Sequence, residues 1–416
     1  MNEMIDLIQI GMKAKETSRY ASRLKTTAKN EILLACADAI EAEADYLIRE
    51  NKKDMDAADK KNAVLLDRLL LTGPRVKSIA SGMREVAAAN DPIGEVLYMK
   101  TMPNGLSIGE KRVPLGVVGI IYESRPNVTA DVFMLCVKSG NACILRGGSE
   151  AINSNIAIVS VIQRTLAALK HPPELVQLIT DTSRETATEF MKLNEYVDVL
   201  FPRGTMSLIN AVIENSNIPV VETGIGNCHI FVDESADLER AVKVIINAKT
   251  SRPGICNACE KLLIHEAVAD KFIPVIGNEL QKHNVEIRGD EKVCSALPFA
   301  KPASEDDWYE EHLSLVISVR VIANIDEAIG HINHYGSSHS DAILTESYSN
   351  ALRFTDEVDS AAVYVNASTR FTDGGEFGLG AEMGISTQKL HARGPMGLKA
   401  LTSTKFIIFG NGQIRE

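Results

Sequence analysis

The sequence has no long apolar run and no excess of basic residues. No uninterrupted hydrophobic stretch approaches the roughly 20 residues that a membrane-spanning helix needs. Acidic residues outnumber basic ones by 55 to 44, so the formal net charge is −11. This charge argues against nucleic acid or an anionic membrane as a partner. An anionic substrate would therefore have to be met by local positive charge.

Cysteine is scarce, and its count is odd. Seven cysteines occur among 416 residues, and most of them stand in apolar runs. This usage fits reduced thiols in the cytoplasm better than a disulfide framework. The N-terminal segment carries Asp6, Lys13, Lys15 and Glu16 and has no uninterrupted apolar core, so it does not look like a secretory signal. A cytoplasmic protein is therefore expected.

The sequence also lacks an intact G-x-G-x-x-G, because Gly224-Ile225-Gly226 and Gly378-Leu379-Gly380 have no third glycine. Any dinucleotide site must therefore be atypical. Two weaker signals remain. Gly204-Thr205 precedes an expected helix, whose free N–H groups would favour phosphate. Arg146 stands before a glycine pair that begins at Gly147, where it could meet a ribose or a phosphate, although a surface arginine is the alternative.

What is present is an alternation of short apolar runs with helical patterns. Helices are expected over 1–90, including one amphipathic stripe over 29–50, and a hairpin is expected around Pro103-Asn104-Gly105. Strands are expected at 117–122, 142–145, 175–179, 197–201, 218–221, 229–232, 262–264, 316–322, 342–344, 362–365 and 405–410. Such alternation predicts a doubly wound parallel sheet followed by a second α/β domain. A chain of this length is too long for one core.

The stretch from Ser251 to Glu260 has the features of a turn that carries a nucleophile. Pro253 and Gly254 break the chain, Cys256 follows, and an apolar strand begins soon after. A cysteine at the edge of a sheet can attack a carbonyl while its backbone N–H faces the developing oxyanion. An ordinary buried thiol is the alternative.

Cys256 and Cys259 also form a C-x-x-C. This spacing admits a redox pair or half of a zinc site. The other possible ligands, Cys228 with His229 and Cys294, lack regular spacing, and a redox pair normally opens a helix instead of a strand. A zinc- or redox-binding interaction protein stays open as a function of another class, whereas a single nucleophile would leave Cys259 in the core.

Two further polar residues stand near ends of expected strands. Glu222 lies at the carboxyl end of the run 218–221, where ligands collect in parallel sheets, although a capping or solvated carboxylate is the commoner fate. Asn127 follows the strand 117–122. Its amide could donate to an oxyanion or could make a local turn.

Taken together, several stretches resemble the aldehyde dehydrogenase superfamily over most of the chain. They are 117–127, 143–150, 222–229, 252–258 and 389–397. The resemblance implies an aldehyde dehydrogenase-like α/β fold with an atypical Rossmann domain, a second α/β catalytic domain and a small β oligomerisation element. The implied segments are 1–97 and 113–223 for the dinucleotide-binding domain, 224–394 for the catalytic domain, and 98–112 and 395–416 for the oligomerisation element.

Within the superfamily, the resemblance points to the branch that reduces L-glutamyl 5-phosphate to L-glutamate 5-semialdehyde and phosphate, the second step of proline biosynthesis from glutamate. It implies Cys256 as the nucleophile that forms a thioester, Asn127 as a donor to the oxyanion, and Glu222 as a residue that tunes the cysteine or holds the nicotinamide. NADPH would be the reductant, and no metal is expected. The residues implied to bind NADP are Arg146, in place of the usual lysine, Gly147, Gly204, Thr205 and Glu311.

The resemblance leaves some choices open. A hydrolytic aldehyde dehydrogenase, in which Glu222 activates water against the thioester, is the alternative reaction. The cations that bind the substrate's carboxylate and phosphate are also open, with Arg125, Arg252, Arg370 and His229 as candidates. A homo-oligomer is expected, with functional coupling to glutamate 5-kinase and no nucleic acid or membrane partner.

Overall fold

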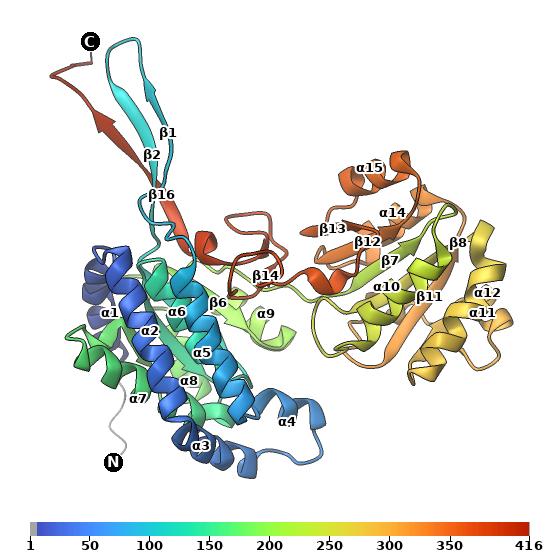
Figure 1. Ribbon diagram of the computed structural model, residues 1–416, viewed down its shortest axis with the longest axis horizontal. Coiled ribbons are helices and arrows are strands. Elements are labelled where there is room, and N and C mark those ends of the chain that lie inside the picture. The colour runs from blue at the N-terminus through green and yellow to red at the C-terminus, as the bar shows by residue number, and fades with distance from the viewer. Residues whose placement is uncertain (1–5, 416) are drawn as a thin grey trace. The chain divides into compact units, whose positions relative to one another are not determined.

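The computed structural model describes residues 6–415, apart from the side chains of residues 63 and 64 (Figure 1). The chain divides into two compact units. Unit 1 comprises Met1–Thr223, Gly378–Gly384 and Met396–Glu416, and unit 2 comprises Gly224–Phe377 and Ile385–Pro395. The structure does not describe residues 1–5, the start of the expected dinucleotide-binding domain. It also does not describe residue 416, the last residue of the expected oligomerisation element. None of the described helices is long and apolar enough to cross a membrane.

Unit 1 begins with helices, as expected. They are α1 (Leu7–Ala21), α2 (Thr26–Ala42), α3 (Ala44–Ala57), α4 (Ala63–Leu69) and α5 (Gly73–Ala88). The single helix expected over 29–50 is wrong, because the chain breaks at Glu43, which has φ −100° and ψ 20°. The apolar spacing runs across this break because α2 buries Leu33 and Ile40 and α3 buries Leu47. Gly73-Pro74 starts a helix, since proline is tolerated in the first turn.

A four-stranded parallel sheet forms the core of unit 1, in the order β5-β4-β3-β6. The strands are β3 (Val117–Tyr122), β4 (Ala142–Gly147), β5 (Val176–Leu178) and β6 (Val199–Arg203), and the associated helices are α6 (Asn127–Lys138), α7 (Ile152–Ala168), α8 (Arg184–Phe190) and α9 (Met206–Asn215). Every residue of β3 and β4 is buried, as continuous apolar runs predict.

Two strands expected for this sheet are placed differently. The run 218–221 forms only one isolated bridge, between Leu200 and Val220. Pro219 has no N–H to donate to a ladder, which limits the pairing to its immediate neighbours. The run 229–232 does form a strand, but it belongs to the sheet of unit 2.

The expected hairpin and the C-terminal strand form a separate antiparallel sheet in unit 1. Its strands are β1 (Val96–Thr101), β2 (Ser107–Pro114) and β16 (Thr402–Phe409), with β2 in the middle. Figure 1 shows this sheet projecting from the helices and the parallel sheet of unit 1. Gly105 takes a positive φ of 86° in the turn that joins the first two strands. All six residues of β1 are exposed.

Unit 2 contains a seven-stranded parallel sheet in the order β10-β9-β11-β8-β7-β12-β13. The strands are β7 (Cys228–Val232), β8 (Cys259–His265), β9 (Glu286–Gly289), β10 (Lys301–Pro302), β11 (Val316–Ile322), β12 (Ser340–Leu344) and β13 (Ala362–Val365). The helices are α10 (Leu238–Thr250), α11 (Glu266–Lys282), α12 (Glu291–Ala296), α13 (Asp306–Tyr309), α14 (Ile325–Tyr335) and α15 (Tyr348–Glu357), and the small hairpin β14 (Ile385–Ser386) and β15 (Gly394–Pro395) completes the unit.

Two apolar clusters lie in this doubly wound arrangement. Ile230 and Leu262 of the central strands lie in one cluster with residues of α10 and α11. Their strand neighbours Phe231 and Leu263 lie in the other cluster with residues of α14 and α15. Because alternate residues of a strand point to opposite faces, the sheet is covered by helices on both sides. The expected second α/β domain is therefore present.

Candidate active site

The loop 251–258 connects α10 to β8 and carries Cys256 at the amino edge of the sheet in unit 2. The backbone N–H of Ala258 donates to the carbonyl of Ile255 at 3.0 Å, which closes a tight turn around the cysteine. Cys256 is half-buried, whereas Cys259 is fully buried in β8. Burial raises the pKa of Cys259 to about 12, so this residue stays a protonated core thiol, as expected.

Asn257 anchors the loop on one side. Its side-chain amide donates to the carbonyl oxygens of Arg370 and Thr372, at 3.3 and 2.9 Å. Its own carbonyl oxygen accepts a hydrogen bond of 2.7 Å from Thr369 Oγ1. The residue that follows Cys256 is thus fixed to the short 3-10 helix η3 (Thr369–Phe371).

The segment before β7 packs against the other side of the loop. A Cβ atom on Gly226 would lie only 1.3 Å from the carbonyl oxygen of Cys256, so only glycine fits here. Cys228 Sγ lies 3.2 Å from the same oxygen. The N–H of Gly226 donates to Glu311 Oε1 at 2.7 Å. Glu311, expected to contact a cofactor, therefore also braces the backbone that touches Cys256.

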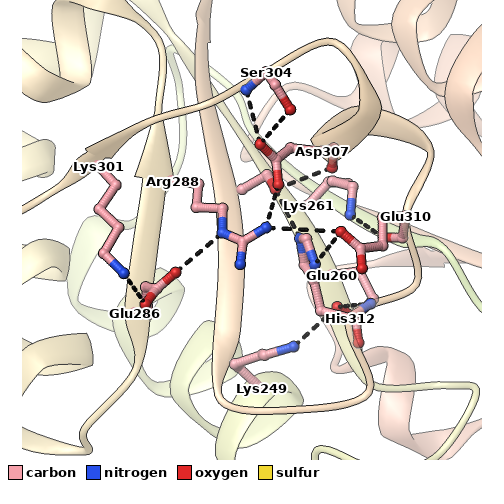
Figure 2. A network of polar contacts seen from close by, with 11 residues as sticks. Lys249, Glu260, Lys261, Glu286, Arg288, Lys301, Ser304, Asp307, Glu310 and His312 are labelled. Carbon is pink, nitrogen blue, oxygen red and sulfur yellow. Dashed lines mark hydrogen bonds and ion pairs between the residues drawn. The ribbon is translucent and has the colours of Figure 1, made fainter.

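A buried network of polar contacts fixes Glu310 and His312, the two residues on either side of Glu311 in the sequence (Figure 2). Lys249 and Glu260 form an ion pair of 3.1 Å, and neither side chain is exposed. Glu260 Oε2 also accepts from the backbone N–H of His312 at 3.2 Å, and Lys261 Nζ donates to the carbonyl of Glu310 at 2.7 Å. Both neighbours of Glu311 are thus fixed to β8, the strand that follows the cysteine loop.

Burial perturbs the titration of this network. It raises the pKa of Glu260 to about 7, against the opposing effect of Lys249 and Lys261. It also lowers the pKa of Lys261 to about 8. For His312, burial and the nearby lysines lower the pKa to about 3, so the ring is neutral and shares a hydrogen bond of 3.0 Å with Ser318 Oγ.

Among the residues that the structure describes, one group of side chains has the spacing of metal ligands, namely Asp307, Glu310 and His312. Arg288 occupies the same place, since its guanidinium pairs with Asp307 and lies 3.7 Å from Glu310 Oε2 (Figure 2). Burial opposes ionisation of Asp307, but the hydrogen bonds from Arg288 and Ser304 outweigh it and lower the pKa to about 2. A cation site is therefore already filled by arginine, and neither cysteine of the C-x-x-C belongs to this group.

In unit 1, several expected site residues meet at the carboxyl edge of the parallel sheet. β4 and β6 both pair with β3, so the residues that follow these three strands share that edge. The residues gathered there are Asn127, Arg146, Gly147, Gly204 and Thr205.

Arg146 is 9% exposed, so the expected alternative of a surface arginine is wrong. Its Nη2 donates to the carbonyl oxygens of Thr182 and Ser183, at 2.6 and 2.9 Å. Its Nε is buried and has no hydrogen-bond partner among the described residues. Burial lowers the pKa of the guanidinium, yet arginine stays charged in proteins. A buried N–H without an acceptor suits an anionic or hydroxyl-bearing ligand such as a dinucleotide.

The start of α9 differs from the expected phosphate cradle. The N–H of Thr205 already donates to Glu123 Oε2 at 2.8 Å, and a Cβ on Gly204 would lie 2.4 Å from the same oxygen. The neighbouring carboxylate of Glu150 accepts from the N–H of Ser124 at 2.7 Å. Neither acidic residue was expected in the site, although Glu123 directly follows β3 and Glu150 lies three residues after the end of β4. Carboxylates at this edge suit ribose hydroxyls better than phosphate.

The two remaining expected catalytic residues also lie in unit 1. Asn127 begins α6, and its amide donates to Asp131 Oδ2 at 2.7 Å. Burial raises the pKa of Asp131 to about 6. Glu222 is half-buried in a segment that forms no strand, so the expected strand end at this carboxylate is wrong. Cys256 and Glu311, by contrast, lie in unit 2.

Known proteins resemble the chain over nearly its whole length. The model of the aldehyde dehydrogenase family matches residues 5–297. Gamma-glutamyl phosphate reductase from Lachnospira eligens is 57% identical over 99% of this chain and 100% of its own, and that from Clostridium perfringens is 56% identical over 99% of each. The crystal structure of gamma-glutamyl phosphate reductase from Thermotoga maritima has a TM-score of 0.95 at 49% identity, covering 99% of this chain and 100% of its own. These matches confirm the resemblance carried by the motifs, and the chain belongs to the aldehyde dehydrogenase family.

Proposed function

We propose that the chain reduces L-glutamyl 5-phosphate to L-glutamate 5-semialdehyde and phosphate, with NADPH as the reductant and Cys256 as the nucleophile. The observation that carries the proposal is a half-buried cysteine on a loop braced from both sides. Near-full-length similarity to proteins named gamma-glutamyl phosphate reductase supports the choice of substrate. The reaction would be the second step of proline biosynthesis from glutamate, carried out in the cytoplasm.

The chemistry at Cys256 follows from its thiolate. Sγ attacks the acyl carbon, the bond from that carbon to the phosphate oxygen breaks, and phosphate leaves with the electron pair, so that a thioester remains. The backbone N–H of Cys256 and the amide of Asn127 are the proposed donors to the oxyanion, and losing one such donor typically costs about 2.7–4 kcal/mol. A nicotinamide cofactor, when bound, would supply the hydride for the acyl carbon of the thioester. The bond from that carbon to Cys256 Sγ then breaks, and the thiolate leaves with the electron pair, which gives the aldehyde.

Members of the aldehyde dehydrogenase family typically use a nicotinamide cofactor, and the choice of NADP is part of the proposal. Its proposed ligands are Arg146, Gly147, Gly204, Thr205 and Glu311. The unpartnered Nε of Arg146 supports this assignment, since it leaves one buried donor for a ligand. The carboxylate of Glu311 would accept a hydrogen bond from a cofactor hydroxyl, either in place of the bond from the Gly226 N–H or together with it.

Glu222 is proposed to tune the cysteine or to hold the nicotinamide. Phosphate leaves before reduction, so the reaction needs no water-activating base at this position. A hydrolytic aldehyde dehydrogenase would instead use Glu222 as that base and release free acid.

The test runs the reaction in reverse, from semialdehyde, NADP and phosphate to NADPH. The wild-type enzyme is expected to need phosphate, and Cys256→Ser is expected to abolish turnover because a hydroxyl is a far weaker nucleophile. Cys294→Ser is the matched control, since Cys294 is a half-buried thiol outside the loop. Oxidation to free acid without phosphate would favour the hydrolytic reaction, and an active Cys256→Ser would refute the assignment of the nucleophile.

The projecting sheet of β1, β2 and β16 is proposed to join copies of this chain into a homo-oligomer. Its edge strand β1 is exposed throughout, and it carries the apolar side chains Val96, Leu97, Tyr98 and Met99. An exposed apolar edge of this kind favours pairing with another strand. Functional coupling to glutamate 5-kinase, the enzyme that would supply the acyl phosphate, is also part of the proposal.

A further inference from the structure

Two arginines of unit 2 differ from all the others in that unit. Each of the others pairs with a carboxylate within 4.0 Å, namely Arg240, Arg288, Arg320, Arg353 and Arg393. Arg252 and Arg370 form no such ion pair with any residue between 6 and 415. In a chain of net charge −11, arginines without a paired carboxylate are the ones available to an anionic ligand.

Both arginines belong to the surroundings of Cys256. Arg252 is an exposed residue of the loop itself, four positions before the cysteine. Arg370 lies on η3, and its guanidinium donates to Asn257 Oδ1 and, at 3.1 Å, to Ser251 Oγ. Those two acceptors are neutral, so they orient the guanidinium without cancelling its charge.

The position of Arg370 is fixed by its backbone as well. Its carbonyl oxygen accepts from the Asn257 amide, and the preceding Thr369 donates to the Asn257 carbonyl. A guanidinium has five N–H donors in a planar fork, of which these side-chain contacts use two. The remaining donors can bind two oxygens of a carboxylate or phosphate at once.

The electrostatics agree with this geometry. Burial and the positive charge of Arg252 both lower the pKa of Arg370, whereas the negative charge of Cys256 raises it. The two guanidinium groups and the sulfur are therefore close enough to influence one another. Two like charges that act on one another are stabilised when an anion binds between them.

We propose that Arg252 and Arg370 bind an oxyanion of the substrate beside Cys256, either the phosphoryl group of the acyl phosphate or the α-carboxylate of the glutamyl chain. The identity of the substrate rests on the proposed function, whereas the anion site rests on the contacts above. The phosphoryl group is bonded to the carbonyl under attack, so cations next to the nucleophile would also stabilise the departing phosphate. These residues would then decide which acyl groups reach the sulfur.

The first experiment needs neither cofactor nor substrate. Cys256 is alkylated with iodoacetate, which is anionic, and in parallel with iodoacetamide, which is neutral and of similar size. The ratio of the two rates is expected to fall about five- to tenfold in Arg252→Gln and in Arg370→Gln, the order expected for removing one charge a few Å away. Inorganic phosphate is expected to slow the reaction of iodoacetate with the wild-type enzyme.

Two further variants control for changes in loop structure. Arg370→Lys keeps the charge, so its ratio of iodoacetate to iodoacetamide rates is expected to stay near that of the wild type. Arg353→Gln removes a paired arginine on α15 and is expected to leave this ratio unchanged. An unchanged rate with iodoacetamide shows that the loop of Arg252→Gln still presents the cysteine. If the ratio is the same in the wild type, Arg252→Gln and Arg370→Gln, the proposed anion site is refuted.

The second experiment distinguishes the two sources of the oxyanion in the phosphate-dependent oxidation of the semialdehyde. A phosphate site predicts a higher KM for phosphate in both variants. A carboxylate site predicts a higher KM for the semialdehyde and no effect on butanal, which has no carboxylate. Unchanged KM values for both substrates would overturn the inference even if the enzyme is active. If the wild-type enzyme shows no phosphate-dependent activity, the proposed function fails, and the alkylation ratio still decides the anion site.

Discussion

Lys249 and Glu260 form a fully buried ion pair of 3.1 Å across the loop that carries Cys256. Lys249 lies in the last turn of α10 and Glu260 is the second residue of β8, so the pair joins the two ends of the loop. Glu260 also holds the backbone of His312. One carboxylate therefore fixes both the cysteine loop and the segment that contains Glu311.

Replacing Glu260 should show how much this ion pair contributes to the free energy of unfolding. In Glu260→Gln the charge of Lys249 stays buried without a counter-ion, and removing one partner of a buried pair typically costs about 3–5 kcal/mol. The free energy of unfolding of unit 2 is expected to fall by this amount in a urea titration. The double variant with Lys249→Met is expected to recover most of the loss, because it removes the stranded charge. A single variant as stable as the wild type would contradict the structural role.

Gly226 gives a second prediction. In Gly226→Ala the new Cβ must displace the backbone carbonyl of Cys256, and a shift of about 1 Å at a reacting group can cost 10²-fold in rate. We expect kcat to fall by about that factor, together with a changed rate of alkylation at Cys256. Gly330→Ala is the matched control, because a Cβ there meets nothing within 4 Å. Equal activity of the two variants would show that the contact with Gly226 does not position the nucleophile.

His339 predicts a dependence of stability on pH. It is fully buried, and burial lowers its pKa from the ordinary 6.5 to about 4. Between these values the unfolded chain binds the proton and the folded chain does not, so stability falls as the pH drops from 6.5 to 4. The loss attributable to this histidine is about 3 kcal/mol. Wild type and His339→Asn are compared by urea unfolding at pH 7 and pH 4. A wild type that loses no more stability than the variant would contradict the assignment.

The projecting sheet predicts a change of oligomeric state. Phe406 and Ile408 on β16 are 61% and 56% exposed and point to one face of the strand. Replacing both with glutamate is expected to yield a smaller species in size-exclusion chromatography with light scattering. Tyr348→Glu, an exposed aromatic residue on α15, is the control and should keep the mass of the wild type. Unchanged mass in the double variant would mean that this sheet does not join the copies.

Much of the fold could be predicted because strands buried in a parallel sheet have sequences that are continuously apolar. The expected strands 316–322 and 362–365 coincide with β11 and β13. The failures have local causes. The periodicity over 29–50 continues through a break at Glu43, and Pro219 removes a donor that a ladder would need.

The site was harder to predict than the fold because its contacts join distant residues. The turn around Cys256 could be recognised from the local sequence. The contact between Gly226 and Glu311 could not, because 85 residues separate them in the chain. The burial of Arg146 depends on carbonyl groups from another segment, which no local pattern shows. The sequence did contain a signal for the buried network. Glu260 and Lys261 are adjacent charged residues near the start of an otherwise apolar strand, and buried charges need partners.

The proposed reaction depends on a covalent bond between the glutamyl group and Cys256. The direct measurement is mass spectrometry of the enzyme after incubation with L-glutamate 5-semialdehyde and NADP in the absence of phosphate. We expect a glutamyl thioester on the peptide that contains Cys256, and this thioester should disappear when phosphate is added. An unmodified Cys256, or an adduct on another cysteine, would contradict it.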